Sequence, residues 1–340
     1  MWKISKMLVA SLFIFLTYPV PVSFASEAGA IPFEVSPILP DNQHGDVRGY
    51  FDLDAVPGQK DKIFIMAKNL KDHQITVKIT PFNAMTSNNG EIIYDVKAKE
   101  DRFIELQADF KKHIQNQSQI VIPAKSSVKI PFEISHLDAA KGMALGGIHV
   151  IAENEAISEE KIEQEHSTFQ IKNQIAYVIG LKIQYPEKAE PDFSFGDVRL
   201  DILDGKPKLV LEMKNSAPAV IKNAKIQYSV ADKRGTVILD GTLPEVGMAP
   251  NTKFDYPVQW LDGEIKSGEY EISLAAEYGG KQITDTKQLA VEKTDDVKEF
   301  NKQTKAEAAD TGIAWWNYLL TALNAIVIFL FVARRLKKRK

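Results

Sequence analysis

Short runs of alternating apolar and polar residues fill the chain from Ile31 to about Val291. This pattern is typical of β-strands that bury one face and leave the other in water. Turn-forming pairs such as Pro57-Gly58 and Asp204-Gly205 separate the runs. The spacing predicts a mainly β protein, built as two immunoglobulin-like β-sandwich domains in tandem. Strands are expected at residues 63–67, 75–79, 128–134, 174–184, 208–213, 224–230, 236–239, 270–276 and 282–291.

Two longer apolar runs lie near the two ends of the chain. Residues 7–18 follow Lys3 and Lys6 and precede the small residues around Ala25. That order is typical of a secretory signal peptide, expected over residues 1–25, with an uncleaved N-terminal anchor as the alternative. Residues 313–333 carry no charge and are followed by a basic tail over residues 334–340. They predict one C-terminal transmembrane α-helix, with the tail in the cytoplasm and the preceding chain outside.

The segment between these ends divides at a polar stretch with two prolines, Tyr185 to Pro191. Such a break between two strand sets predicts a domain boundary. We therefore expect a first sandwich over residues 26–186 and a second over residues 187–292. Residues 293–312 are rich in Lys, Glu, Asp and Ala, and are expected to form a charged juxtamembrane stalk.

Three shorter segments have local patterns of their own. Asp101 to Gln117 places apolar residues at near-helical spacing, which predicts a short helix or an irregular insert. Glu153 to Glu165 is charged and is expected to be a mobile surface loop. Ser267 to Tyr270 is similar to the turn that leads into a late strand of immunoglobulin-like domains, where the tyrosine can bond back to the backbone.

Charge and cysteine content limit the partners. Without Lys3, Lys6 and the six basic residues of the tail, 34 basic residues remain against 45 acidic ones, a net charge of −11. This argues against nucleic acid as a ligand of the whole surface. The chain has no cysteine, so it has neither disulfides nor a cysteine for lipid attachment. An exported domain without disulfides favours a Gram-positive bacterial surface.

The sequence contains no convincing catalytic or metal-binding motif. The six histidines are scattered, and there is neither a nucleophile elbow nor a glycine-rich phosphate loop. Ser126 and Lys129 fit the S-x-x-K motif of penicillin-binding enzymes, but they head an alternating strand rather than a helix. Asp52 and Asp54 share a strand face, where a solvated face is favoured over a calcium site. We expect no enzyme activity, no metal and no cofactor.

Four segments carry a resemblance to a known family. They are FEVSPILPDNQ at 33–43, GYFDL at 49–53 with PGQ at 57–59, LGGI at 145–148, and IKNQIAYVIG at 171–180. In sequence, order and spacing they resemble the WxL-interacting proteins of Gram-positive bacteria. Together with the signal peptide, second sandwich, span and basic tail, the resemblance covers essentially the whole chain.

The resemblance implies a first domain that binds peptidoglycan and a second that binds host proteins. It also implies partnership with secreted WxL-domain proteins. This chain has no Trp-x-Leu of its own, so it is expected to be the membrane-tethered partner and not itself a WxL protein. The expected function is a cell-surface adhesion or scaffold protein of the plasma membrane, single-pass, with its ectodomain on the wall side. A surface receptor or sensor component without catalytic activity is the alternative.

Two sets of residues are candidate contact sites. The first is an edge strand to which a partner strand could add, with a central core strand as the alternative. Its residues are Leu145, Gly146, Gly147, Ile148 and His149. The second is one face of the expected transmembrane helix, Asn317, Thr321 and Asn324. Polar side chains inside a membrane favour association with another helix, with a monomer as the alternative.

Overall fold

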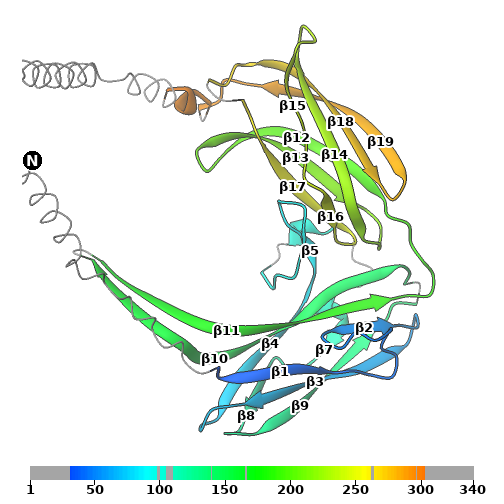
Figure 1. The fold of residues 1–340 in the computed structure, drawn as a ribbon, viewed down its shortest axis with the longest axis vertical. Coiled ribbons are helices and arrows are strands. Elements are labelled where there is room, and N and C mark those ends of the chain that lie inside the picture. The colour runs from blue at the N-terminus through cyan, green and yellow to red at the C-terminus, as the bar shows by residue number, and fades with distance from the viewer. Residues whose placement is uncertain are drawn as a thin grey trace, which may run out of the picture.

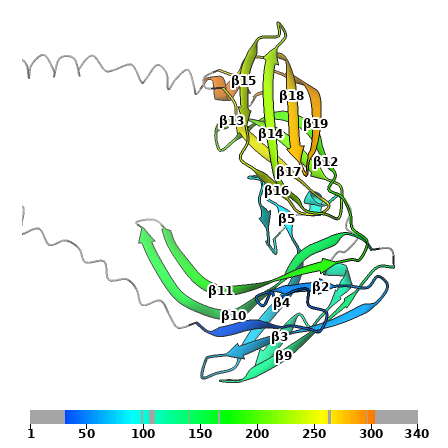
Figure 2. The same ribbon diagram turned by 45° about the vertical axis from the view of Figure 1, so that its right-hand side comes forward.

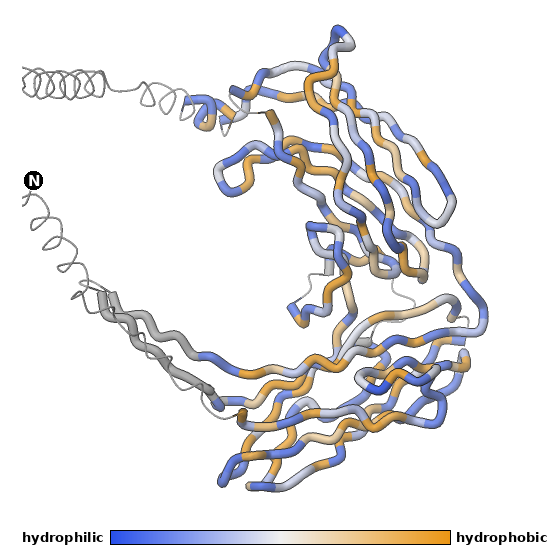
Figure 3. The backbone as a smooth tube through the Cα atoms, in the orientation of Figure 1, coloured by the Kyte–Doolittle hydropathy of each residue, from blue (hydrophilic) through white to orange (hydrophobic). Residues whose placement is uncertain are grey.

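The chain folds into two β-sandwiches that follow one another in sequence (Figure 1). The structure is a computed structural model, and it describes residues 31–97, 100–104, 110–138, 140–164, 167–261, 264–295 and 297–302. Apolar and polar positions alternate along most strands, as the backbone coloured by hydropathy shows (Figure 3). The prediction of a mainly β protein with two sandwiches is therefore confirmed, and each predicted strand falls wholly or mostly within an observed one.

The first sandwich packs a four-stranded sheet on a five-stranded one. The order in the first sheet is β1 (Phe33–Ile38), β3 (Lys60–Asn69), β9 (Ser127–Ser135) and β7 (Ile114–Gln115). The order in the second sheet is β2 (Phe51–Asp54), β11 (Ser167–Gln184), β10 (Met143–Gln164), β4 (Ile75–Asn83) and β8 (Gln119–Ile122). Alternate residues from both sheets meet in one apolar core, whose largest fully buried members include Phe33, Phe51 and Phe132.

The second sandwich has its own core. One sheet has the order β12 (Phe193–Leu203), β13 (Lys206–Asn215) and β17 (Thr252–Gln259). The other has β15 (Val237–Thr242), β14 (Ile221–Asp232), β18 (Gly268–Tyr278) and β19 (Lys281–Val291), and β16 (Val246–Met248) also pairs with β14. Trp260 packs edge-on against Tyr270 with ring centroids 5.5 Å apart. The Tyr270 hydroxyl donates to the Lys266 carbonyl at 2.9 Å, which is the backbone bond that the sequence predicts for this turn.

Strands β10 and β11 continue beyond the first sandwich as a two-stranded ribbon (Figure 2). Their pairing runs from Met143 opposite Gln184 to Gln164 opposite Ser167. The expected loop over Glu153 to Glu165 is therefore wrong, because β10 extends to Gln164. The ribbon leaves the core, so neither face imposes the apolar alternation by which strands are recognised in a sequence.

The expected insert over residues 101–117 is irregular where it is described. It contains a 3-10 turn, η2 (Glu100–Arg102), and a single helical turn, α2 (Phe110–His113). Within the described parts of the chain, no helix combines the length and the apolarity that a membrane crossing requires. The expected transmembrane helix, including Asn317, Thr321 and Asn324, lies outside the described residues, as do the signal peptide and the basic tail.

A small hairpin of the first domain joins the two sandwiches. Its strands, β5 (Met85–Thr86) and β6 (Ile92–Ile93), lie between them, and β5 contacts β16 and β17 (Figure 1). The buried Thr86 hydroxyl accepts the Ala249 N–H at 3.0 Å and lies 2.7 Å from the hydroxyl of Thr252. At the hairpin turn, Gly247 donates its N–H to the Gly90 carbonyl at 2.7 Å. Buried bonds of this kind hold two domains in one orientation.

We predict that Thr86→Val destabilises the protein by about 1–3 kcal/mol, because the buried Ala249 N–H loses its acceptor while the side-chain volume is kept. Urea unfolding of the full-length chain measures the change. Thr284→Val, on an exposed position of β19, is the control and is expected to change stability by less than about 0.5 kcal/mol. If the two variants change the free energy of unfolding equally, the bond between Thr86 and Ala249 does not stabilise the contact between the domains.

Candidate functional site

The strand segment from Leu145 to His149 lies in the interior of its sheet. On one side, Gly146 to Ala152 pair with β4, and on the other side the same segment pairs with β11. The expectation that these residues form a sheet edge is therefore wrong, and the alternative of a central strand holds. Ile148 is completely buried, which is what a strand paired on both sides and packed on the core requires.

The outer face of this sheet has a floor of two glycines. Gly147 of β10 lies directly opposite Gly180 of β11, so neither position places a Cβ on this face. A Cβ added to Gly147 would lie 2.8 Å from Cζ of Phe82, the residue paired with it on β4. A Cβ added to Gly180 would lie 3.4 Å from Cβ of Tyr50. Aromatic side chains therefore flank the glycine floor on both sides.

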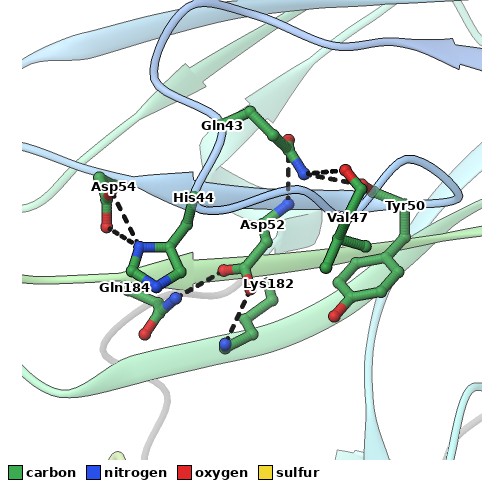
Figure 4. A network of polar contacts seen from close by, with 8 residues as sticks. All are labelled: Gln43, His44, Val47, Tyr50, Asp52, Asp54, Lys182 and Gln184. Atoms are coloured by element: carbon green, nitrogen blue, oxygen red, sulfur yellow. Dashed lines mark hydrogen bonds and ion pairs between the residues drawn. The ribbon is translucent and has the colours of Figure 1, made fainter.

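A polar network presents Tyr50 beside this floor (Figure 4). The Gln43 side-chain amide donates to the carbonyls of Val47 and Tyr50, both at 3.1 Å, and its oxygen accepts the Asp52 N–H at 3.2 Å. Gln43 thus closes the loop that leads into β2. The ring of Tyr50 extends away from the network (Figure 4) and is 37% exposed.

Asp52 anchors β2 to β11. Its side chain is almost completely buried, and it accepts hydrogen bonds from Lys182 at 2.9 Å and from Gln184 at 2.7 Å. Asp54 instead bonds to His44 at the surface, at 3.0 Å. The expectation of a solvated acidic face therefore fails for Asp52, whose charge is balanced by Lys182. In the part of the chain that the structure describes, no three His, Cys, Asp or Glu side chains group closely enough to hold a metal ion.

The segment that follows β6 adds a second tyrosine and an acid to the same face. Burial raises the pKa of Tyr94, and the neighbouring Tyr50 phenol raises it further. Burial lowers the pKa of His149, an outer-face residue of β10, with Asp95 opposing this effect and Lys78 adding to it. We call Tyr50, Tyr94 and His149 around the glycine floor the sheet-face site. It offers two partly exposed tyrosine side chains and one imidazole beside the partly buried Gly180, with Gly147 buried beneath the Phe82 ring.

A buried chain of polar groups lies behind the site. The His136 ring lies 3.1 Å from the Tyr185 hydroxyl and 2.9 Å from the Asp61 carboxylate. An acid, a histidine and a hydroxyl in this order resemble a catalytic triad. Here the hydroxyl is the phenol of Tyr185, a residue only 3% exposed, in place of an accessible nucleophile. Burial, with Asp61 nearby, raises the pKa of Tyr185 to about 12, so the phenol stays protonated at neutral pH. The chain of bonds ties the end of β11 to β3 and β9.

The sequence pointed to part of this site. Gly147 and His149 were candidates and belong to it, although as parts of a sheet face. Leu145, Gly146 and Ile148 lie in the same strand but outside the site. Tyr50 and Gly180 lay within the motifs that carried the family resemblance, without a role. Tyr94 was missed, because nothing in its local sequence indicates that a hairpin brings it to this face.

Comparisons with known proteins assign the family. Residues 33–152 match a family model described as the peptidoglycan binding domain of the WxL Interacting Protein. Residues 166–302 match a model described as the host binding domain of the same protein. The chain belongs to the WxL-interacting protein family. No curated protein matches the chain.

Solved structures give weaker likenesses. The class 5 fimbriae chaperone CfaA shares 12% identity over 75% of this chain and 98% of that one, with a TM-score of 0.30. The CsuC–CsuE chaperone–adhesion subunit complex of Acinetobacter baumannii shares 10% sequence identity over 66% of this chain and 89% of that one, with a TM-score of 0.27. The PapD-like domain 7 of human CEP192 shares 9% sequence identity over 51% of this chain and 97% of that one, with a TM-score of 0.26. These scores are low, so the fold class of this WxL-interacting protein follows from its own strand order.

The two matched segments of the WxL-interacting protein are separated by residues 153–165. The match to the host binding domain begins at residue 166, so it includes β11. In the structure, β11 pairs along its length with β10 of the first sandwich. The sheet-face site therefore takes Gly147 from one matched segment and Gly180 from the other.

We predict that Gly147→Ala destabilises the protein by about 1–3 kcal/mol, because the added methyl overlaps the Phe82 ring. Gly180→Ala adds the same methyl where there is room, and should change stability by less than about 1 kcal/mol. Urea unfolding of both variants measures the difference. A Gly180→Ala variant as unstable as Gly147→Ala would contradict the described packing of the glycine floor.

We also predict that His149 makes stability depend on pH. Because the folded chain holds the pKa of His149 below its usual value of about 6.5, the unfolded chain binds a proton there at a higher pH than the folded chain. This contribution is complete above pH ~6.5 and is lost as pH falls below it. His149→Gln should therefore lose less stability than wild type between pH ~7.5 and ~5.5. Urea unfolding of both proteins at the two pH values measures the loss of stability. If wild type and His149→Gln lose equal stability, the described environment of His149 is wrong.

Proposed function

We propose that this WxL-interacting protein is a non-catalytic scaffold on a Gram-positive cell surface, with peptidoglycan glycan bound at its sheet-face site. Its protein partners in this proposal are WxL-domain surface proteins, with host proteins as ligands of the second sandwich. The match of residues 33–152 to a peptidoglycan binding domain supports the ligand class. The observation that carries the site is the pair of partly exposed, neighbouring tyrosines Tyr50 and Tyr94, of which Tyr50 lies against Gly180.

The chemistry of the sheet-face site suits a sugar chain. A sugar ring presents an apolar C–H face and polar hydroxyl edges. Tyrosine presents an apolar ring face and a polar hydroxyl tip, so the two can stack and exchange hydrogen bonds together. Gly180 is only partly buried and has no Cβ, so a flat ring can approach the sheet there, whereas the Phe82 ring covers Gly147. His149 and the nearby Asp95 and Lys78 supply donors and acceptors at the margin.

The electrostatics also favour a neutral sugar over an anionic polymer. The chain between the signal peptide and the basic tail carries a net charge of −11. A polyanion would be repelled by such a surface at long range, whereas an uncharged sugar ring is not. Binding at the sheet-face site then depends on stacking and hydrogen bonds, which salt weakens little.

The remaining parts of the proposal rest on sequence. The uncharged run over residues 313–333, with its basic tail, supports a single-pass anchor in the plasma membrane. Asn317, Thr321 and Asn324 share one helix face, which supports association with another helix. A charged stalk over residues 293–312 supports a position for both sandwiches above the membrane, facing the wall.

Sedimentation with insoluble peptidoglycan tests the ligand and the site together. The double variant Tyr50→Ser/Tyr94→Ser should bind about tenfold or more weakly than the wild-type full-length chain, because each stacked ring contributes about 0.5–1.5 kcal/mol. Val121→Ser is the control, because it removes an exposed apolar side chain at the far edge of the same sheet. Equal binding by the double variant would exclude the site, and no binding by wild type would exclude the ligand.

A further inference from the structure

One long stretch of backbone in the first sandwich pairs on one side only. In the described pairings, β11 contacts β2 only from Leu181 to Gln184. From Gln174 to Gly180 its described strand partner is β10 alone. A strand with one unpaired side presents N–H and C=O groups on which another extended chain can add.

The direction of these groups follows from a bond at the end of the strand. The Gln184 carbonyl accepts the Ala55 N–H at 2.9 Å on the β2 side. Backbone groups alternate in direction along an antiparallel strand, so residues two apart point to the same side. The register of β11 on β10 is continuous from Gln184 to Ala176. Ala176 and Val178 therefore direct their N–H and C=O groups to the unpaired side of β11, which we call the β11 edge.

The β11 edge lacks the devices that protect other edges of this protein. Natural sheets block unwanted pairing with short edge strands, charges, prolines or bulges. The other edge strands of the two sandwiches have such devices. Three are short, since β2 and β8 have four residues each and β7 has two, and two contain a proline, Pro37 in β1 and Pro257 in β17. Strand β12 is bulged, and the last two carry charges, Asp240 in β15 and Lys281, Asp285 and Lys287 in β19. Between Ser167 and Gly180 the sequence has no proline and a single charge, Lys172.

The other side of the same ribbon makes the contrast within one element. Beyond Ala152, β10 also lacks a second neighbour among the described strands. Its sequence there contains Glu153, Glu155, Glu159, Glu160, Lys161 and Glu163. The pairing with β11 is also shifted twice, between Ile151 and Ala156 and between Ala156 and Ser158. The β10 edge of the ribbon is therefore irregular and its sequence is highly charged, whereas the β11 edge has a continuous register from Gln184 to Ala176 and one charge.

Burial along β11 shows where the open edge begins. Ile179, Leu181 and Ile183 are each at most 4% exposed, near the segment that β2 covers. Tyr177 and Ile175, further along the same face, are only partly buried. On the opposite face Val178 is 46% exposed. An added strand would cover apolar side chains on both faces of the sheet.

We propose that the β11 edge is the docking site for a protein partner, which adds one extended, uncharged and proline-free segment as a further strand of the sheet. The proposal rests on the proposed function, in which the partner is a WxL-domain protein. Main-chain hydrogen bonds to Ala176 and Val178 supply the affinity. Apolar residues on the two faces of the segment pack beside Tyr177 on one face and Val178 on the other.

The test uses the full-length chain and purified WxL-domain proteins secreted by the same organism. Val178→Pro removes one outward N–H and places a ring where the partner strand would lie, in a position that an edge strand tolerates. Val121→Pro is the matched control. Val121 is 53% exposed on β8, at the opposite edge of the same sheet. The Ser118 carbonyl points towards β4, because it accepts the Ile79 N–H. Directions alternate along a strand, so the Val121 N–H, three residues further on, points away from β4.

Val178→Pro should weaken binding by about tenfold or more, while Val121→Pro leaves it within about threefold. On binding, the wild-type amides of Ala176 and Val178 should become protected from hydrogen exchange. Thermal unfolding reports whether both proline variants fold. If Val178→Pro does not fold, the double variant Ala176→Lys/Val178→Lys is used in its place. Lysines on an edge strand disfavour the addition of another strand without removing a backbone N–H.

Three results would overturn the proposal, and they are distinguishable. Undiminished binding by folded Val178→Pro would remove the β11 edge from the interface and leave the proposed partnership intact. No binding of any WxL-domain protein by wild type would remove the partnership itself, and the docking site with it. Dimers of wild type alone that Val178→Pro dissociates would show that a second copy of this chain occupies the edge.

Discussion

The antiparallel pairing of β10 with β11 is the constraint on which the rest of the structure depends. These two strands form the centre of the five-stranded sheet and continue beyond it as the ribbon. Their register sets Gly147 opposite Gly180 and so creates the glycine floor. A shift of one residue would exchange the inner and outer faces and place Ile148 and Ile179 in solvent. The buried core therefore fixes the geometry of the sheet-face site.

The same pairing connects recognition to domain arrangement. At its end, β11 runs into Tyr185, whose hydroxyl lies within the buried chain of His136 and Asp61. Near the start of β10, the Met143 N–H donates to the Pro218 carbonyl of the second sandwich at 2.7 Å. With the Thr86 contact at the small hairpin, these bonds join both sandwiches. One face and one edge of a single sheet then give two adjoining surfaces, the face for a sugar chain and the edge for a protein strand, which meet where His149 lies opposite Val178.

The sequence predicted those features that depend on local pattern. Alternation located nine of the strands but not β12 or β17 of the second sandwich. The motif containing Tyr50 pointed to the loop that Gln43 closes. The ribbon was missed because a strand pair in solvent needs no apolar alternation. The edge assignment of residues 145–149 failed because the neighbours of a strand come from distant segments, here β4 and β11. Tyr94 was missed for the same reason, since only the folded chain brings it beside Tyr50.

Amide hydrogen exchange along β11 in the full-length protein without partners tests the central pairing most directly. If the register is as described, the Tyr177 and Ile179 amides bond to β10 and exchange slowly, whereas the Ala176 and Val178 amides face the open edge and exchange fast. The account predicts this alternation of slow and fast amides. Uniform protection from Ala176 to Ile179, or the reverse alternation, would contradict both the open edge and the register that forms the glycine floor.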